Sequence, residues 1–379
     1  MDQKLAVLFM PDDMTLTKEQ TPLMLRPILF CPILTWMVEE LMGRGIERFF
    51  IVSDKRAHDM MRPYVPENAD VVYVDGARHG EELLTLLKDE KGSVLIVNGA
   101  VLPVGVFSGG AVYSADAKEC CKVLKEHGAF AAFPKGAEIT KGFLPVGDDE
   151  ELRSAQDMCR RKIADKHFAA GVSIMDPNNT YIDPRVKIGS GTVILPGTIL
   201  RGRTVIGKNC TIGPNTMIRD CVIGDETEVN ASQLNESRIG SHTNVGPFAY
   251  VRPNSTIGDH VKVGDFVEIK NSVIGNGTKI SHLTYVGDSD CGERINFGCG
   301  TVTTNYDGFK KFRCTIGDDA FIGCNTNLIA PVTVGSGSYI AAGSTITDEV
   351  PADSLALARS RQVNKPGWAV TWRAAHEKK

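Results

Sequence analysis

The segment IGSHTNVGPFAYVRPNSTIGDHVKVGDFVEI, residues 239–269, carries an aliphatic residue at every sixth position, and glycine often follows it. A period of six is the signature of a parallel β-helix, in which each coil has three short flat faces. The aliphatic side chains then fill the interior of the prism, while glycine and small residues ease the corners. The same spacing recurs at 182, 188, 194, 200, 206, 212 and 218, and again at 316, 322, 328, 334, 340 and 346.

This repeat predicts a left-handed parallel β-helix of about nine coils between residues 182 and 350. The spacing falls to five between Ile218 and Ile223 and between Ile269 and Ile274, which we interpret as distortions or loops. At 301–315, TVTTNYDGFKKFRCT, polar, aromatic and cationic residues replace the repeat, which predicts a loop that leaves the prism. A solvated loop without a role is the common case. Its amide, phenol and two lysines favour contact with a ligand or a neighbouring subunit.

The first 150 residues follow a different pattern, in which short aliphatic runs alternate with amphipathic stretches. We expect strands at 4–10, 48–54, 70–75 and 93–99, and helices at 32–45, 55–65 and 80–90. This alternation predicts an α/β domain with a mostly parallel sheet. A charged stretch at 148–171 predicts a helix. The expected domains are therefore 1–150 (α/β), 151–178 (helical connector), 179–365 (β-helix) and 366–379 (C-terminal tail).

The tail, in KPGWAVTWRAAHEKK, is expected to form a short basic helix that packs its two tryptophans on the end of the prism. The 379 residues carry a net charge of −4, which offers no basic field to nucleic acid or an anionic membrane. The sequence contains neither a membrane-spanning apolar run nor a secretory leader, so a cytoplasmic protein is expected. The ten cysteines lack a C-x-x-C pattern and are interpreted as reduced, mostly buried thiols.

A histidine lies within KISHLTYVGD, residues 279–288, where the spacing assigns Ile280 and Val286 to the interior. His282 therefore points outward, which disfavours a buried core histidine. An imidazole is mostly neutral at cytosolic pH, as a general base requires. From position alone, a lone surface histidine is at least as good an interpretation.

Cationic residues of neighbouring coils change that balance. Because a coil has about 18 residues, positions 252 and 270 lie on successive coils, one above the other. After the shorter spacing, the next position of this stack is about 287. Arg252, Lys270 and Tyr285 are therefore expected to form a patch beside His282. Two cations with a phenol suit a phosphate group, although a solvated ladder of salt bridges with Glu268 is the alternative. A further hypothesis is that Glu268 accepts a hydrogen bond from the imidazole and fixes its tautomer.

Several segments, in one order, carry a specific resemblance: GPFAYVRP, VGDFVEIKNSVIGNGTKISHLTYVGD, NFGCGTVTTNYDG, LIAPVTVGSGSYIAAGSTIT and ALARSRQVNK. They resemble the acetyltransferase half of the bifunctional bacterial N-acetylglucosamine-1-phosphate uridyltransferase/glucosamine-1-phosphate N-acetyltransferase family. The likeness covers residues 170–365. It implies a homotrimer with active sites between subunits. Its reaction would acetylate glucosamine 1-phosphate from acetyl-CoA, without a metal, in the synthesis of UDP-N-acetylglucosamine for peptidoglycan precursors.

The resemblance also implies a role for each matching residue. His282 would deprotonate the attacking amine. The phosphosugar would be held by Arg252, Lys270, Tyr285, Asn296 and, from the loop, Lys311. Acetyl-CoA would be bound by Cys299, Asn305, Tyr306, Cys324, Ala342 and Arg359, with Asn305 and Tyr306 near the thioester. The family commonly has serine at Cys324 and often alanine at Cys299, which puts a hydroxyl hydrogen bond at position 324 in doubt.

The amino-terminal half resembles the uridyltransferase domain of the same family only weakly. The family opens its first strand into a glycine-rich phosphate loop, whereas here the strand runs into PDDMTLTKEQTP, with no glycine until Gly43. Side chains would hinder the approach of a triphosphate to the backbone, and Asp12 and Asp13 would repel it. Ala100 replaces the expected metal-binding carboxylate. We therefore predict that uridyl transfer is lost and that the domain is a scaffold, an oligomer support or a relict sugar-nucleotide site.

Two other hypotheses stay open. The chain would acetylate a different amino sugar phosphate, or it would be a regulatory paralogue that binds ligand without turnover. The presence of His282, Asn305 and Tyr306 together argues against the second hypothesis, because a decayed site is expected to lose its base first.

Overall fold

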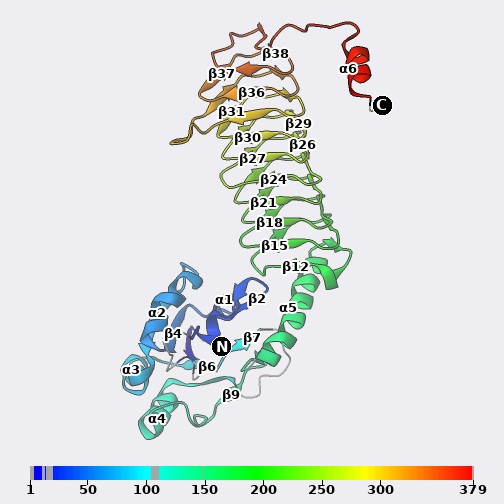
Figure 1. Ribbon diagram of the computed structural model, residues 1–379. Coiled ribbons are helices and arrows are strands. Elements are labelled where there is room, and N and C mark those ends of the chain that lie inside the picture. The colour runs from blue at the N-terminus through cyan, green and yellow to red at the C-terminus, as the bar shows by residue number, and fades with distance from the viewer. Residues whose placement is uncertain (1–3, 11–12, 14–19, 104–110, 148, 378–379) are drawn as a thin grey trace. The chain divides into compact units, whose positions relative to one another are not determined.

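The computed structural model describes residues 4–10, 13, 20–103, 111–147 and 149–377. The chain divides into two compact units, Met1–Ile206 with Ile218–Asp220, and Gly207–Met217 with Cys221–Lys379. The first unit contains the α/β domain, a long helix and the first strands of the β-helix (Figure 1). The second unit contains the later coils and the tail.

The α/β domain is built on one sheet with the strand order β5-β4-β1-β6-β8-β9. These strands are β1 (Leu5–Phe9), β4 (Arg48–Ser53), β5 (Asp70–Asp75), β6 (Ser93–Asn98), β8 (Val112–Asp116) and β9 (Glu138–Ile139). β1 pairs in parallel with β4 and β6, and β4 pairs in parallel with β5. β8 is antiparallel to both β6 and β9. The four predicted strands and the mostly parallel sheet are confirmed, whereas β8 and β9 were not predicted.

Short helices follow the strands of this sheet. They are η2 (Leu23–Leu25), α1 (Ile33–Gly43), α2 (Lys55–Met61), η3 (Arg62–Tyr64), η4 (Gly76–Arg78), α3 (His79–Leu87) and α4 (Ala117–His127). The predicted helices at 32–45, 55–65 and 80–90 are confirmed, and the second ends in a 3₁₀ turn at Pro63, which has no N–H to donate. One core cluster joins Val7, Phe50 and Ile96 of the sheet to Leu83 of α3 and Leu124 of α4.

Two small hairpins complete the domain. One pairs β2 (Pro27–Ile28) with β3 (Cys31–Pro32), and the other pairs β7 (Val101–Leu102) with β10 (Leu144–Pro145). The predicted helix at 148–171 is confirmed as α5 (Asp149–Ala169), which contacts β2. α5 buries an apolar stripe that includes Leu152, Ala155, Cys159 and Ile163, together with His167.

The β-helix begins in the first unit, directly after α5. Its first strands are β11 (Ser173–Ile174), β12 (Tyr181–Ile182), β13 (Lys187–Ile188), β14 (Val193–Ile194), β15 (Ile199–Arg201) and β16 (Val205–Ile206), with the 3₁₀ turn η5 (Pro177–Asn179) between β11 and β12. β11 pairs in parallel with β14, β12 with β15, and β13 with β16. The interval of three strands means that one coil supplies one strand to each of three faces. β18 (Met217–Arg219) lies at the boundary of the two units.

Three parallel sheets form the faces of the later coils. The first face consists of β17 (Thr211–Ile212), β20 (Glu228–Val229), β23 (Asn244–Val245), β26 (Lys262–Asp265), β29 (Lys279–His282), β32 (Asn296–Phe297), β35 (Phe321–Ile322), β38 (Tyr339–Ile340) and β40 (Leu355–Ala356). The second face consists of β21 (Gln233–Asn235), β24 (Tyr250–Val251), β27 (Glu268–Lys270), β30 (Tyr285–Gly287), β33 (Val302–Thr304), β36 (Asn327–Ile329) and β39 (Thr345–Ile346). The third face consists of β19 (Val222–Ile223), β22 (Arg238–Ile239), β25 (Thr256–Ile257), β28 (Val273–Ile274), β31 (Ser289–Cys291), β34 (Cys314–Ile316) and β37 (Val332–Val334).

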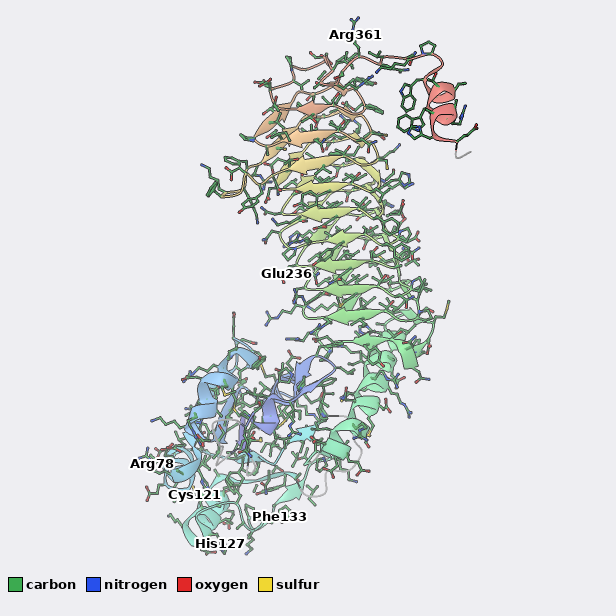
Figure 2. The ribbon with its side chains drawn as sticks, in the orientation of Figure 1. Arg78, Cys121, His127, Phe133, Glu236 and Arg361 are labelled. Atoms are coloured by element: carbon green, nitrogen blue, oxygen red, sulfur yellow. The ribbon has the colours of Figure 1, made fainter. Side chains whose placement is uncertain are left out.

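The aliphatic positions of the repeat are buried, as predicted; Ile269, Ile280 and Val286, for example, are fully enclosed. Other side chains project from the outside of the coils, and Glu236 marks one outer edge in Figure 2. The slips in spacing are tight corners rather than loops, because Asp220 and Asn271 turn the chain there with φ of 51° and 47°. The predicted loop at 301–315 leaves the prism between β33 and β34, and Phe309 at its tip is 94% exposed.

The tail forms the predicted helix as α6 (Trp368–His376), but it does not pack on the prism as expected. No residue of α6 is buried. The rings of Trp368 and Trp372 stack on each other instead, with centroids 5.3 Å apart, and His376 stacks on Trp372. Residues 357–367, which lead to the helix, are exposed as well. The apolar side of this helix is therefore uncovered in a single chain.

The cysteines fit the interpretation as reduced thiols. None of the ten, all of which lie among the described residues, forms a disulfide bond, and seven of them are buried. Burial raises the pKa of Cys31, Cys120 and Cys159 to about 12, so these thiols stay protonated at neutral pH. Within the part of the chain that the structure describes, no helix is long and apolar enough to cross a membrane.

His167 makes the stability of the first unit depend on pH. Burial, with a smaller contribution from Lys166, lowers its pKa from 6.5 to about 4. As the pH falls from about 6.5 to about 4, the His167 imidazole of the unfolded chain takes up a proton, whereas that of the folded chain stays neutral. The free energy of unfolding therefore decreases over this range. In the wild type, this histidine is expected to lower the free energy of unfolding by about 2–3 kcal/mol between pH 7.5 and pH 4.5. We expect His167→Leu to lack this contribution, as measured by urea unfolding at the two pH values. His127→Leu, at the exposed end of α4, is the control, and an equal pH dependence in wild type and His167→Leu would contradict the prediction.

Candidate functional site

His282 lies at the end of β29, and its side chain is 57% exposed. Its outward direction confirms the prediction made from the six-residue spacing. The imidazole Nδ1 lies 2.5 Å from Oδ1 of Asp265, which occupies the paired position one coil earlier in β26. This hydrogen bond, aided by backbone N–H groups and by Lys262, holds the pKa of Asp265 below its usual range. Asp265 is therefore an ionised acceptor at neutral pH.

Glu268 is not the partner of the imidazole, so the hypothesis that it fixes the tautomer is wrong. Its Oε1 accepts a hydrogen bond of 2.8 Å from Nη1 of Arg252, as the alternative of a salt-bridge ladder anticipated. The reason is geometric. Glu268 pairs with Tyr285 on the second face, whereas His282 ends a strand of the first face, before the corner.

Arg252 and Lys270 stack on successive coils of the second face, as predicted. Val251 pairs with Ile269, and Lys270 pairs in turn with Gly287. Gly287 has a specific use here, because a Cβ at this position would lie 2.3 Å from Oη of Tyr285. The absence of a side chain lets the phenol lie along the face above Lys270. Arg252, Lys270 and Tyr285 thus share a face, and Tyr285 begins that face just after the corner that carries His282.

The loop brings a second amine to Lys270. The neighbouring Lys270 ammonium lowers the pKa of Lys311, because two positive charges at this distance repel each other. On the other side, Nζ of Lys270 lies 3.5 Å from Oδ2 of Asp288. Both ammonium groups therefore lie near a single carboxylate, that of Asp288. The two positive charges exceed its one negative charge, so this part of the surface can accept a further anion.

Asp288 is the buried centre of this arrangement, and it is only 4% exposed. Its carboxylate accepts from Nδ2 of Asn271 at 2.5 Å and from Nδ2 of Asn305, whose amide also reaches Oη of Tyr285 at 3.4 Å. Asn305 is thus buried and held in place. These bonds fasten the start of the loop to the second face.

The loop itself is built by local hydrogen bonds. Arg313 binds both carboxylate oxygens of Asp290 and donates to the Asn271 carbonyl at 3.0 Å, which fixes the end of the loop. Tyr306 and Lys311 form an antiparallel bridge, and the Tyr306 hydroxyl donates to the Gly308 carbonyl at 2.6 Å. Figure 1 shows the loop projecting from the coils near β31. Lys311 is thereby carried on a defined hairpin and directed back to Lys270.

The residues assigned to coenzyme A follow the corner that begins with His282. The Asn325 N–H donates to the Cys299 carbonyl, and the Gly343 N–H donates to the Cys324 carbonyl, both at 2.8 Å. Ala342 lies above Gly323, where a Cβ would come within 2.5 Å of its backbone N, and Arg359 approaches Gly343. One edge of the β-helix therefore carries, on successive coils, Cys299, Cys324, Ala342 and Arg359. Cys324, Ala342 and Arg359 are exposed, and Cys299 is half-buried.

Asn296 and Tyr306 are placed differently from the other predicted residues. Asn296 lies half-buried in β32, on the same face as His282 and one coil later, rather than with Arg252 and Lys270 on the second face. Tyr306 lies on the exposed loop. A ligand that bends around the corner would touch both faces.

Sequence reasoning missed three residues of this site: Asp265, Asp288 and Arg313. The signal for Asp265 was present, because the coil here is 17 residues long and Asp265 precedes His282 by that interval. Asp288 follows the Tyr-Val-Gly run by one residue, at a corner with φ of 49°. Arg313 stands at the end of the loop, and its sequence carried no signal for Asp290 as its partner.

Part of the expected nucleotide site of the α/β domain lies outside the described residues, and the described part is tightly packed around Ala100. Ala100 is buried and meets Met10, Met24 and Asp13, and the hollow between them leaves no volume for a water molecule. The Asp13 carboxylate accepts from the backbone N–H groups of Leu23 at 2.7 Å and of Met24 at 3.2 Å. The Asp13 carboxylate is thus buried and holds η2, rather than being exposed to a ligand. Asp12 lies outside the described residues.

Comparisons with known proteins agree with the repeat. Residues 236–271 and 313–348 match the family described as Bacterial transferase hexapeptide (six repeats), which accords with the left-handed form of the β-helix. The chain is 49% identical over 247 residues to the Bifunctional protein GlmU of a Geobacillus species, covering 65% of this chain and 54% of that protein. It is 51% identical over 248 residues to the protein of the same name from Clostridium kluyveri, with the same coverage. The chain thus spans about half the length of the curated relatives it matches.

A solved structure, the Arabidopsis UDP-N-acetylglucosamine acyltransferase, shows a weak likeness. It is 19% identical, covers 49% of this chain and 69% of its own, and has a TM-score of 0.31.

The paired amines give a direct test of the site's geometry. Because the pKa of Lys311 is lowered by Lys270, more of its amine is neutral and nucleophilic near pH 8. We expect Lys270→Gln to slow the labelling of Lys311 by an amine-reactive ester, measured by peptide mass spectrometry. Lys262→Gln, which removes a lysine from the first face, is the control and leaves the rate unchanged. Equal labelling of Lys311 in wild type and Lys270→Gln would show that the two amines are not neighbours in solution.

Proposed function

We propose that this chain transfers the acetyl group of acetyl-CoA to the amine of glucosamine 1-phosphate. The observation that carries the proposal is one corner of the β-helix. An outward imidazole paired with a carboxylate ends the first face there. Lys270 stands on the second face, and the loop brings the amine of Lys311 next to it. The similarity to proteins named Bifunctional protein GlmU supports an acetyl transfer of this kind.

In this proposal His282 is the base. Its Nε2 accepts a proton from the amine as the amine nitrogen attacks the thioester carbonyl; the C–S bond then breaks and coenzyme A leaves as the thiol. Such a base contributes roughly 10²–10⁴-fold to the rate. Holding the amine and thioester together supplies a further large part, and no step of this scheme requires a metal ion.

The phosphate of the acceptor would bind between Lys270 and Lys311. A dianionic phosphate relieves the repulsion between the two amines, and Arg252 and Tyr285 on the same face would complete its contacts. Asn296, on the face that carries His282, would hold the sugar. An acceptor that spans the corner in this way keeps its amine beside the imidazole.

Acetyl-CoA would lie along the same corner, past Cys299, Cys324, Ala342 and Arg359. Asn305 and Tyr306 would be near the acetyl group. Cys324 exposes its side chain at the position where the family commonly has serine, so its backbone is the group that would contact coenzyme A.

We also propose that the protein works as a homotrimer. Three large apolar residues, Phe248, Phe266 and Leu283, form a ridge on one corner, and each is 57–60% exposed. Phe248 and Phe266 stack with centroids 5.5 Å apart, and all three have positive φ, which is costly for large side chains. This ridge adjoins His282 directly. Contact with a second copy would cover it and would place a neighbouring chain at the site.

The acetyl transfer is tested by thiol release from acetyl-CoA with glucosamine 1-phosphate. We expect His282→Gln to lower kcat by about 10²–10⁴-fold, because the base is removed while the fold is kept. His260→Gln is the matched control, since His260 is another histidine at a corner, stacked on His242. Equal turnover by wild type and His282→Gln, or binding of acceptor without turnover as in a regulatory paralogue, would contradict the proposal. Faster turnover of another amino sugar phosphate would change the acceptor and keep the chemistry.

We further propose that the α/β domain transfers no uridyl group and serves as a scaffold or an oligomer support. The closed hollow at Ala100 and the inward carboxylate of Asp13 support this proposal. Incubation with UTP, Mg²⁺ and N-acetylglucosamine 1-phosphate is expected to release no pyrophosphate above a blank without protein. Release that depends on the protein would show that the site opens and that the domain is active.

A further inference from the structure

We propose that Asp265 is a positioning residue that holds His282 with its proton on Nδ1, so that Nε2 is free to accept a proton. The effect on acetyl transfer rests on the proposed function, whereas the tautomer itself does not.

The backbone sets the two residues against each other. β26 and β29 each have four residues, while the neighbouring β23 and β32 have two. The extra length extends the ladder until Asp265 pairs directly with His282. Gly264 makes this close stacking feasible, because a Cβ there would lie 2.0 Å from the Ser281 carbonyl oxygen. The 2.5 Å contact is therefore built into the coil.

The charge state of Asp265 determines which ring nitrogen carries the proton. An ionised carboxylate can only accept hydrogen bonds, and the lowered pKa of Asp265 keeps it ionised at neutral pH. Nδ1 must then be the donor, which leaves the lone pair of the neutral ring on Nε2. Lys262 also acts on Asp265. Cys299 follows His282 by one coil on the ladder in which Ile280 pairs with Phe297. Glu268, the nearest carboxylate on the following face, is engaged by Arg252.

This pair has a second consequence when the ring takes up a proton. The imidazolium then faces a carboxylate, which stabilises its positive charge. Without the carboxylate, the free ring would rotate and would favour the tautomer with the proton on Nε2, where it cannot act as a base. The side chain of Asp265 is 37% exposed, so a replacement there leaves the core of the coil intact.

The tautomer is tested by long-range ¹H–¹⁵N spectra of the full-length protein, with the His282 signals assigned from their loss in His282→Gln. We expect neutral His282 of the wild type to carry its proton on Nδ1. Asp265→Leu, which has no acceptor, shifts the population towards Nε2–H, and Asp265→Glu restores part of the original state. A wild-type ring protonated on Nε2, or the same tautomer in Asp265→Leu, would overturn the inference.

Kinetics provide the second readout. We expect Asp265→Leu to lower kcat at neutral pH by about tenfold, a part of the roughly 10²–10⁴-fold that a general base supplies, with KM for the acceptor little changed. Asp319→Asn is the control: it removes an exposed carboxylate paired with Arg294 and keeps the kcat of wild type.

The two proposals fail in distinguishable ways. If the wild type shows the Nδ1–H tautomer but no thiol release, the acetyl transfer is wrong and the role of Asp265 in orienting the ring stands. If the wild type is active and Asp265→Leu has the same tautomer and kcat, Asp265 does not position the base.

Discussion

The interior column of aliphatic residues is the constraint on which the rest of the second unit depends. Because every sixth side chain must fill the prism, the directions of the side chains between them are fixed, and residues one coil apart are stacked. Coils pack so closely that Gly298 and Gly323 have no space for a Cβ, which would lie 2.5 Å from backbone N atoms of the next coil. A distance of 17 or 18 residues along the sequence thus becomes a contact in space.

The sequence was sufficient for features that depend on this period alone. It predicted the β-helix, the outward direction of His282, and the stacking of Arg252 on Lys270. The sequence was insufficient where a corner changes the number of residues in a coil. The corner at Asn271, with φ of 47°, has one residue fewer, so that Asp265 rather than Gly264 pairs with His282. A positive φ at a residue other than glycine has only a weak sequence signal.

The other differences arise where partners are distant in the sequence. The pair of Lys270 and Lys311 depends on how the loop folds back, and that depends on Arg313 meeting Asp290. Asp13 looked like a charge facing a ligand, yet its carboxylate satisfies the N–H groups of η2. A buried carboxylate with two backbone donors is a structural solution that composition cannot distinguish from an exposed one. The tryptophans of α6 were expected to pack against the prism, but none of the residues that the structure describes buries them.

The loop between β33 and β34 shows how this architecture accommodates change. Glu293 hydrogen-bonds to Asp318 across 25 residues, whereas the equivalent bond from Asp259 to Asn276 spans 17. The additional residues form a loop that projects from the coil, and the register of the coils on either side is preserved. A solenoid can therefore acquire or lose a ligand-contacting element by insertion at a corner, without re-optimising its core.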